Sequence, residues 1–203
     1  FFLSNSKRNP NNDSWFNYDD NEEKTVGGQN GLGAKISGIF SEYFEIETVD
    51  AQRKLHYVQR FEDNLSVIKK PVITKYTKKS FTTIRFKPDF AKFNKKKLDN
   101  DMFEIMSKRV YDACAVTDNE INIYFNNEKL DYKNFEKYVD LYLGSKTEHP
   151  RVYEKLNDRW EIVASYNDNN GFDQISFVNG LWTIRGGKHV ECILNQISKK
   201  LVD

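Results

Sequence analysis

The residues with the clearest chemical potential form a glycine-rich segment near the N-terminal end. From Gly27 to Lys35 the chain reads Gly-Gly-Gln-Asn-Gly-Leu-Gly-Ala-Lys. Glycines let a backbone approach a ligand closely and adopt positive φ. The N–H groups at the start of a helix attract anions. Lys35 would add a positive charge and Asn30 a hydrogen-bond donor, so the segment has the chemistry of a phosphate-binding loop.

A helix is expected to follow the loop and to position it. Apolar residues recur there with helical spacing at Ile36, Ile39, Phe40 and Tyr43. Positions i, i+3, i+4 and i+7 lie on one face of a helix. The spacing therefore predicts a helix of about ten residues that begins at the glycine loop and carries Lys35 in its first turn.

The spacing of the glycines leaves a second interpretation open. The segment ends in Gly-Ala-Lys, so it lacks the Gly-Lys-Ser/Thr ending of a Walker A loop. It is also no dinucleotide fingerprint, because the glycines occur in another order and no strand is predicted before them. From its residues alone the segment is either a phosphate loop or a plain flexible turn.

The remaining patterns predict a mixture of strands and helices. Aromatic and β-branched runs predict strands, and apolar residues at helical spacing predict helices. The predicted strands are Phe44–Val49, Leu55–Phe61, Phe81–Phe86 and Ile121–Phe125, the last followed by a turn at Asn126-Asn127, with a hairpin joining Trp160–Tyr166 to Gln174–Ile184 around residues 167–171. The predicted helices are Leu98–Val116 and a C-terminal one that carries Val190, Ile193, Leu194, Ile197 and Leu201. Phe135–Leu143 is either a short helix or a mixed segment, and the fold class is α+β.

Composition excludes several classes of protein. The 203 residues carry 31 Lys+Arg and 30 Asp+Glu, and this balance argues against a polybasic tail. Two cysteines, Cys114 and Cys192, cannot form a disulfide scaffold and favour a reducing compartment. No apolar run reaches the roughly 20 residues of a membrane helix. The start at Phe1, without a Met, predicts an internal fragment of a longer protein.

A series of short motifs runs along nearly the whole chain from Asn17. They are Asn17–Glu22, Gly27–Lys35 with Ile39–Ser41, Phe81–Asp89, Lys108–Asp112, Tyr138–Leu143, Arg159–Glu161, Ser176–Asn179 and Gly186–Val190. In this order they resemble the ATP lid, the end of the ATPase domain and the transducer of eukaryotic-type (type IIA) DNA topoisomerase II. Each motif is weak by itself, and their order makes the set specific.

The resemblance implies a fold and a division into domains. Residues 1–130 would form the C-terminal portion of an ATPase domain, an α/β sandwich shared with gyrase, heat-shock chaperones and histidine kinases. Residues 131–203 would begin the transducer domain, which has a ribosomal-protein-like fold. The predicted boundary lies near Asp131, where one set of strands and helices ends and another begins.

The resemblance also implies a function. Members of the family are homodimers that use ATP and Mg²⁺. They pass one DNA duplex through a transient double-strand break in another. The expected partners are therefore double-stranded DNA and a second protomer, and no membrane. The residues that would wrap the phosphates of ATP are Asn17, Gly28, Gln29, Asn30, Gly31, Leu32, Gly33, Ala34 and Lys35. The family's catalytic Glu, Mg-binding Asn and adenine-binding motif lie upstream, and its Gln-Thr-Lys loop and cleavage Tyr lie downstream. We therefore assign no catalytic residue and no metal ligand here, and we expect no ATP hydrolysis by the fragment alone.

Three departures from the family pattern keep a second function open. Gln29 stands where the family has Arg, Leu32 where it has Tyr, and Trp15-Phe16 where it has Ser-Ser. Alternatively Leu3–Ser6 matches the Ser-Ser strip, and residues 7–16 are an insertion. The alternative function is a catalytically inactive nucleotide-binding or DNA-associated interaction module of the same fold.

The amino-acid usage bears on the source of the chain and on its location. Frequent Lys, Asn, Phe and Tyr favour an AT-rich genome, either of a protist or of a large DNA virus. The expected location is the nucleus in the first case and the viral factory or host cytoplasm in the second.

Overall fold

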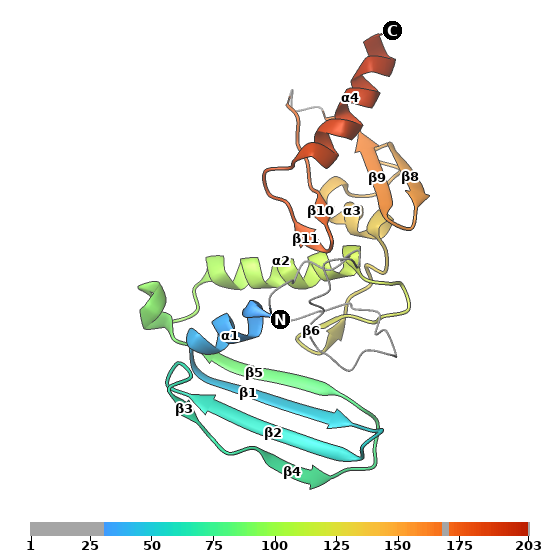
Figure 1. The fold of residues 1–203 in the computed structure, drawn as a ribbon. Helices are drawn as coiled ribbons and strands as arrows, with labels where there is room; N and C mark the ends of the chain where they lie inside the picture. The colour runs from blue at the N-terminus through green and yellow to red at the C-terminus, as the bar shows by residue number, and fades with distance from the viewer. Residues whose placement is uncertain (1–30, 168–170, 203) are drawn as a thin grey trace. The chain divides into compact units, whose positions relative to one another are not determined.

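The computed structural model describes residues 31–167 and 171–202, and these residues pack as two compact units. The N-terminal unit comprises residues 31–99 of the described chain. The C-terminal unit comprises residues 100–167 and 171–202. Each unit has its own secondary structure, which Figure 1 labels along the chain.

The N-terminal unit consists of a short helix followed by an antiparallel sheet. Its elements are α1 (Leu32–Ile39), β1 (Ser41–Asp50), β2 (Leu55–Glu62), β3 (Val67–Ile68), β4 (Val72–Lys75), β5 (Thr82–Pro88) and the 3₁₀ turn η1 (Phe90–Phe93). The three strands predicted from the sequence in this region are confirmed as the long strands β1, β2 and β5. The short strands β3 and β4 were not predicted.

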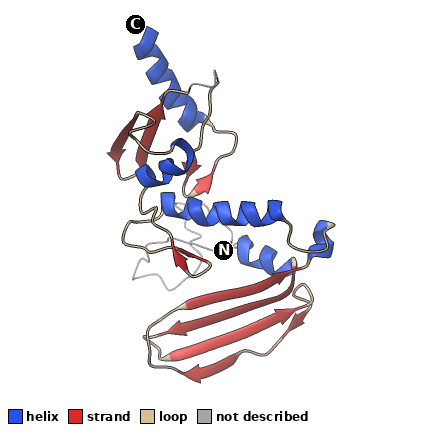
Figure 2. Ribbon diagram, turned by 180° about the vertical axis from the view of Figure 1, so that it is seen from behind, coloured by secondary structure: helices blue, strands red, loops and turns tan. Residues whose placement is uncertain are grey.

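Strand β1 lies at the centre of this sheet. It pairs with β2 from Tyr43↔Glu62 to Asp50↔Leu55. On its other edge it pairs with β5 from Ser41↔Pro88 to Thr48↔Thr82. Strands β3 and β4 both pair with β2, so the order is β3-β2-β1-β5 with β4 beside β2 (Figures 1 and 2).

The two faces of the sheet differ in chemistry because side chains alternate along each strand. On one face Arg85 donates to Glu47 at 2.7 Å and to Glu45 at 3.1 Å. The hydrogen bond from Arg85, together with one from His56, lowers the pKa of Glu47, which remains ionised. On the other face Phe44 is buried and its ring lies 6.4 Å from that of Phe86. Phe44 therefore contributes to the core on one face, and Arg85, which is half exposed, covers the glutamates on the other.

Helix α1 is shorter than the sequence predicts. It ends at Ile39, and Phe40 is its C-cap residue. The predicted apolar face extends to Tyr43, but Tyr43 lies in β1 and pairs with Glu62. The helix ends here because Ser41 already pairs with Pro88 of β5, and the Phe40 carbonyl accepts a hydrogen bond from the Asp89 N–H at 2.8 Å. Strand pairing thus overrides the helical periodicity.

The C-terminal unit contains three helices and three small hairpins among its described residues. The helices are α2 (Asn100–Val116), α3 (Phe135–Leu143) and α4 (Lys188–Val202). The strands are β6 (Tyr124–Phe125), β7 (Glu128–Lys129), β8 (Arg151–Asn157), β9 (Trp160–Ser165), β10 (Phe177–Val178) and β11 (Leu181–Trp182). Helices α2 and α4 were predicted, and the first of the two alternatives for Phe135–Leu143, a short helix, is confirmed. The turn at Asn126-Asn127 was also predicted, and both residues have positive φ.

The predicted hairpin between Trp160–Tyr166 and Gln174–Ile184 is wrong. Strand β9 pairs instead with β8, from Arg151↔Ser165 to Asn157↔Trp160. The second segment folds on itself, with Phe177 opposite Trp182. Its turn is formed by Asn179 and Gly180, which have φ values of 50° and 75°. Asn-Gly is a strong signal for a two-residue hairpin turn, and it lies inside the segment that was predicted as one strand.

A buried carboxylate holds α2 and α3 together. Asp112 is 2% exposed and accepts hydrogen bonds from Lys108 at 2.7 and 2.9 Å and from Arg109 at 3.1 Å. Tyr138 of α3, which is 1% exposed, donates to the same carboxylate at 2.6 Å. A buried charge costs free energy unless it is paired and hydrogen-bonded. The two cations and the phenol meet that condition, so the charge fixes how the two helices pack.

Replacing Tyr138 by Phe tests this packing. The change removes the hydrogen bond to Asp112, and we expect a loss of about 1.5–3 kcal/mol in the free energy of unfolding at pH 7. Burial and the Asp112 bond raise the pKa of the Tyr138 phenol above its ordinary value. The protonated phenol therefore stabilises the folded state below about pH 10. This contribution is lost as the pH rises above about 10, the pKa of tyrosine in the unfolded chain. The difference between Tyr138→Phe and the unsubstituted protein should therefore narrow above about pH 10.

Tyr142→Phe is the matched control. Tyr142 lies one helical turn away, and its hydroxyl is 2.9 Å from that of Tyr138. It is 44% exposed, so water can replace the lost contact. Urea unfolding at pH 7 and pH 10.5 measures the Tyr138→Phe difference, and Tyr142→Phe should show only a small loss in the free energy of unfolding at pH 7. An equal loss in the free energy of unfolding for Tyr138→Phe and Tyr142→Phe at pH 7 would contradict the role given to Tyr138.

Candidate functional site

The predicted phosphate loop leads into the N-terminal end of α1. Gly31 is the N-cap residue, with φ 62° and ψ 15° in the left-handed region. Glycine adopts this conformation without the steric cost that a Cβ atom adds. The first turn of α1 contains no acidic residue, and the N-cap glycine has no side chain to cap it. The first N–H groups of the helix therefore point outward with the positive end of its dipole.

The structure brings together five of the nine predicted ATP-binding residues. Gly31, Leu32, Gly33, Ala34 and Lys35 are all exposed and lie within the first turns of α1 or at its cap. The other four predicted residues, Asn17, Gly28, Gln29 and Asn30, lie outside the described residues, and their part in the site stays a prediction.

The arrangement at the start of α1 can bind an anion. The helix N-terminus offers N–H donors, and Lys35 adds a side-chain cation. Leu32 is 52% exposed and brings no polar atom, so backbone groups and Lys35 carry the polar chemistry here. These residues fit the phosphates of a nucleotide. They do not fit a metal ion, because none of them has an oxygen-bearing or imidazole side chain.

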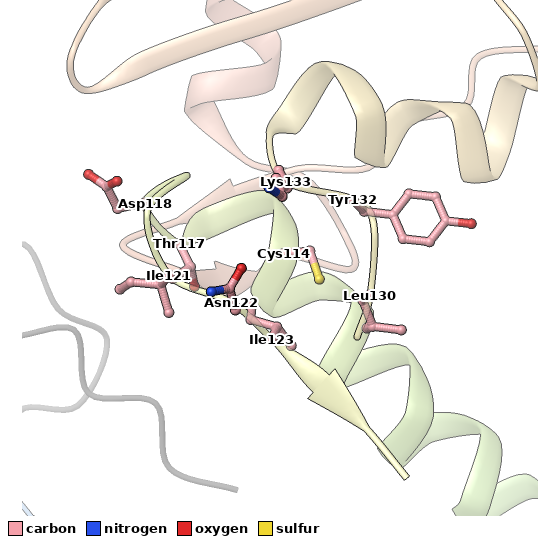
Figure 3. Close-up of a pocket in the computed structure, with 9 residues that line it drawn as sticks. All are labelled: Cys114, Thr117, Asp118, Ile121, Asn122, Ile123, Leu130, Tyr132 and Lys133. Atoms are coloured by element: carbon pink, nitrogen blue, oxygen red, sulfur yellow. The ribbon is translucent and has the colours of Figure 1, made fainter. Parts of the chain in front are cut away.

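A small pocket in the C-terminal unit does not fit a nucleotide. It is lined by Cys114, Thr117, Asp118, Ile121, Asn122, Ile123, Leu130, Tyr132 and Lys133 (Figure 3). Its volume of about 10 Å³ is close to the minimum for one water molecule. Burial raises the pKa of the Cys114 thiol. The thiol therefore stays protonated and is a poor nucleophile.

The part of the chain that the structure describes offers neither a metal-ion cluster nor a membrane-spanning helix. Among residues 31–167 and 171–202, no three His, Cys, Asp or Glu side chains are grouped so that they could hold a metal ion. No helix in the same ranges is long and apolar enough to span a membrane.

Comparison with known proteins decides the family. DNA topoisomerase 2 of Arabidopsis thaliana is 45% identical over 193 residues, which cover 92% of this chain. DNA topoisomerase 2 of Acanthamoeba polyphaga mimivirus is 43% identical over 184 residues, or 89% of the chain. The chain belongs to the DNA topoisomerase II family. Its relatives come from cellular eukaryotes and from a virus, and no protein-family model matches it.

Solved structures locate the chain within that family. It matches the crystal structure of the ATPase region of Saccharomyces cerevisiae topoisomerase II with a TM-score of 0.84 and 44% identity over 92% of the chain. The ATPase and transducer domains of DNA topoisomerase II from Balamuthia mandrillaris give a TM-score of 0.83 and 40% identity, also over 92% of the chain. The chain is thus part of a topoisomerase II ATPase region with an α+β fold, as the motifs predicted.

The match covers only part of each relative. The chain spans 13% of the Arabidopsis protein and 49% of the yeast ATPase-region structure. The ATPase region implies the use of ATP by the family.

Substitution of Gly31 tests the backbone geometry of this site. Gly31→Val places a β-branched residue at a φ of 62°, a conformation that costs about 1–2 kcal/mol and shifts the helix start. We expect an affinity for a non-hydrolysable ATP analogue that is about tenfold weaker. Gly31→Asn is the control, because Asn tolerates this conformation, and its affinity should change less than threefold. Equal affinities for both variants, measured by titration calorimetry, would refute this geometry.

Proposed function

We propose that the complete protein is an ATP-dependent type II DNA topoisomerase, which passes one DNA duplex through a transient double-strand break in another. This chain would supply the lid that wraps the phosphates of ATP and the start of the transducer. The observation that carries the proposal is the open N-terminus of α1, capped by Gly31 and followed by Lys35, in a chain of this family.

The residues at the start of α1 would bind and orient the phosphates. Backbone N–H groups of Leu32, Gly33 and Ala34 are the first three of the helix and have no carbonyl partner within it. They would donate to phosphate oxygens, and the Lys35 ammonium would neutralise part of the phosphate charge. The remaining contacts with the phosphates are proposed to come from Gly28, Gln29, Asn30 and Asn17. The cleavage of the phosphate bond would use a general base, which the family pattern places upstream of the lid.

The domain division proposed from the sequence follows the family. Residues 1–130 would be the C-terminal portion of the gyrase-type ATPase sandwich, and residues 131–203 the start of the ribosomal-protein-like transducer. Contacts divide the chain elsewhere, between Asp99 and Asn100, because α2 packs with α3. On this proposal the boundary near Asp131 crosses a shared core in which Tyr138 of the transducer donates to Asp112 of the ATPase domain.

The cofactor and partners are proposed on the same basis. Mg²⁺ would enter with the phosphates of ATP and be held by groups outside the described residues. The protein would work as a homodimer on double-stranded DNA. It would act in the nucleus if its source is cellular, and in the viral factory or host cytoplasm if its source is viral.

Lys35→Ala in the complete protein tests the proposed role of the lid. The variant removes a charge-assisted contact with phosphate, which corresponds to about a 10–100-fold loss of ATP affinity. Lys35→Arg keeps the charge and should lose less. We would measure binding of a non-hydrolysable ATP analogue together with ATP-dependent DNA strand passage. Unchanged binding by Lys35→Ala would refute the phosphate site.

The unsubstituted proteins separate the two candidate functions. The complete protein should hydrolyse ATP and relax supercoiled DNA, whereas the 203-residue chain alone should show no ATP hydrolysis. ATP binding by the complete protein without turnover would support the alternative, a catalytically inactive nucleotide-binding module. The departures at Gln29 and Leu32 are the features that favour this alternative.

A further inference from the structure

The turn between β2 and β3 has a strained backbone at a bulky residue. Asp63, Asn64 and Leu65 have φ values of 50°, 58° and 69°. Asp and Asn tolerate this left-handed conformation, but a leucine there is an outlier that costs about 1–2 kcal/mol. Strain of this kind persists only where surrounding contacts outweigh it. Contacts around Leu65 must therefore hold it in this conformation.

The Leu65 side chain fills a notch in α1. Gly38 is the buried residue of this helix. A Cβ atom built on Gly38 would lie 2.7 Å from Cδ2 and 3.1 Å from Cγ of Leu65. A Cβ atom there would force the Leu65 side chain to move, so the glycine is what lets the leucine pack directly on the helix backbone.

Asn64 ties the same turn to the end of α1. Its N–H and its side-chain amide both donate to the carbonyl of Ser41, at 3.1 and 3.2 Å. The amide also donates to the Asp89 carboxylate at 3.2 Å. Ser41 is 1% exposed, and its hydroxyl donates to the carbonyl of Ser37 in α1 at 2.5 Å. The turn, the start of β1 and the residue after β5 therefore meet at the C-terminal end of α1.

The opposite end of α1 carries the proposed phosphate site, and its apolar side chains are exposed. Leu32 is 52% exposed and Ile36 49%. An eight-residue helix is about 12 Å long. If its anchored end tilts by about 10°, its N-terminus moves by about 2 Å. A displacement of that size is enough to misplace hydrogen-bond donors relative to a phosphate.

We propose that Asn64 and Leu65 are positioning residues for the ATP lid. They do not touch the nucleotide. They hold the C-terminal end of α1 so that Gly31 and Lys35, at the other end, meet the phosphates of ATP. The inference rests on the proposed function, because it requires that the N-terminus of α1 binds phosphate.

Leu65→Gly in the complete protein is the decisive variant. It removes the side chain that packs on Gly38 and relieves the backbone strain, so the two effects on stability oppose each other. We expect the melting temperature to change by only a few degrees. We expect the affinity for a non-hydrolysable ATP analogue to fall about tenfold or more. Leu65→Met, which can fill the same notch, should keep the affinity within about twofold.

Lys54→Gly is the matched control. Lys54 lies in the turn between β1 and β2 with a φ of 56°, and it is exposed. The substitution relieves strain in the same sheet without contact with α1, so analogue affinity should not change. Equal losses in Lys54→Gly and Leu65→Gly would assign the effect to the sheet and overturn the inference. Unchanged affinity in Leu65→Gly would also overturn it.

Two further variants keep the test interpretable. If Leu65→Gly fails to fold, Asn64→Gly takes its place, because it keeps the left-handed turn and loses only the two side-chain hydrogen bonds. It should also weaken analogue binding about tenfold, and unchanged binding would overturn the inference. Lys35→Ala separates this inference from the proposed function. If Lys35→Ala weakens binding and Leu65→Gly does not, only the positioning role is wrong. If neither does, the phosphate site itself is wrong.

Discussion

The pairing of β1 along both of its edges is the constraint on which the N-terminal unit depends. Ser41 ends the helix and opens the strand, and from Tyr43 to Thr48 each residue has partners in both β2 and β5. A strand fixed on two sides has a fixed register, so the residues just before it are fixed as well. The end of α1 therefore inherits its position from the sheet, although few residues of the helix are themselves buried.

A buried charge has the corresponding role in the C-terminal unit. Asp112 is surrounded by Lys108, Arg109 and Tyr138, so its position allows little variation in how α2 and α3 pack. The Lys108 ammonium also lies 3.7 Å from the centre of the Trp182 ring. The hairpin β10–β11 is thereby joined to the same group of side chains. Apolar packing alone specifies orientation less sharply than a charge that must keep its partners.

Much of this fold is predictable from the sequence, and the errors have identifiable causes. The long strands and helices α2 and α4 of the C-terminal unit follow from local periodicity. The pairing of β9 does not, because pairing between strands is set by turn chemistry, and Asn179-Gly180 forms a turn inside the segment predicted as one strand. The end of α1 differs from the prediction because Phe40 and Tyr43 continue a helical pattern that the pairing of Ser41 with Pro88 interrupts.

The candidate site also has a part that the sequence predicts and a part that it does not. The chemistry of the site is local, because the glycine-rich segment with Gly31 and Lys35 predicts anion binding from sequence alone. The resemblance to the family then specifies ATP as the ligand. The support of the site is not local. Leu65 and Gly38 are separated by 26 intervening residues, and no pattern in either segment indicates that they meet. Asp63-Asn64 signals a turn, but the sequence does not show that the next residue is held in a left-handed conformation.

A helix with an exposed N-terminus must be fixed in place by contacts elsewhere. On the proposed function the first N–H groups of α1 must stay open to phosphate, so the helix cannot be held firmly at that end. It is held at its other end, where the Asn64 hydrogen bonds and the Leu65 contact outweigh the backbone strain at Leu65. Departures of the lid side chains from the family pattern affect individual contacts. The direction of the helix N–H groups depends instead on this distant anchor, because a helix transmits the orientation of one end to the other.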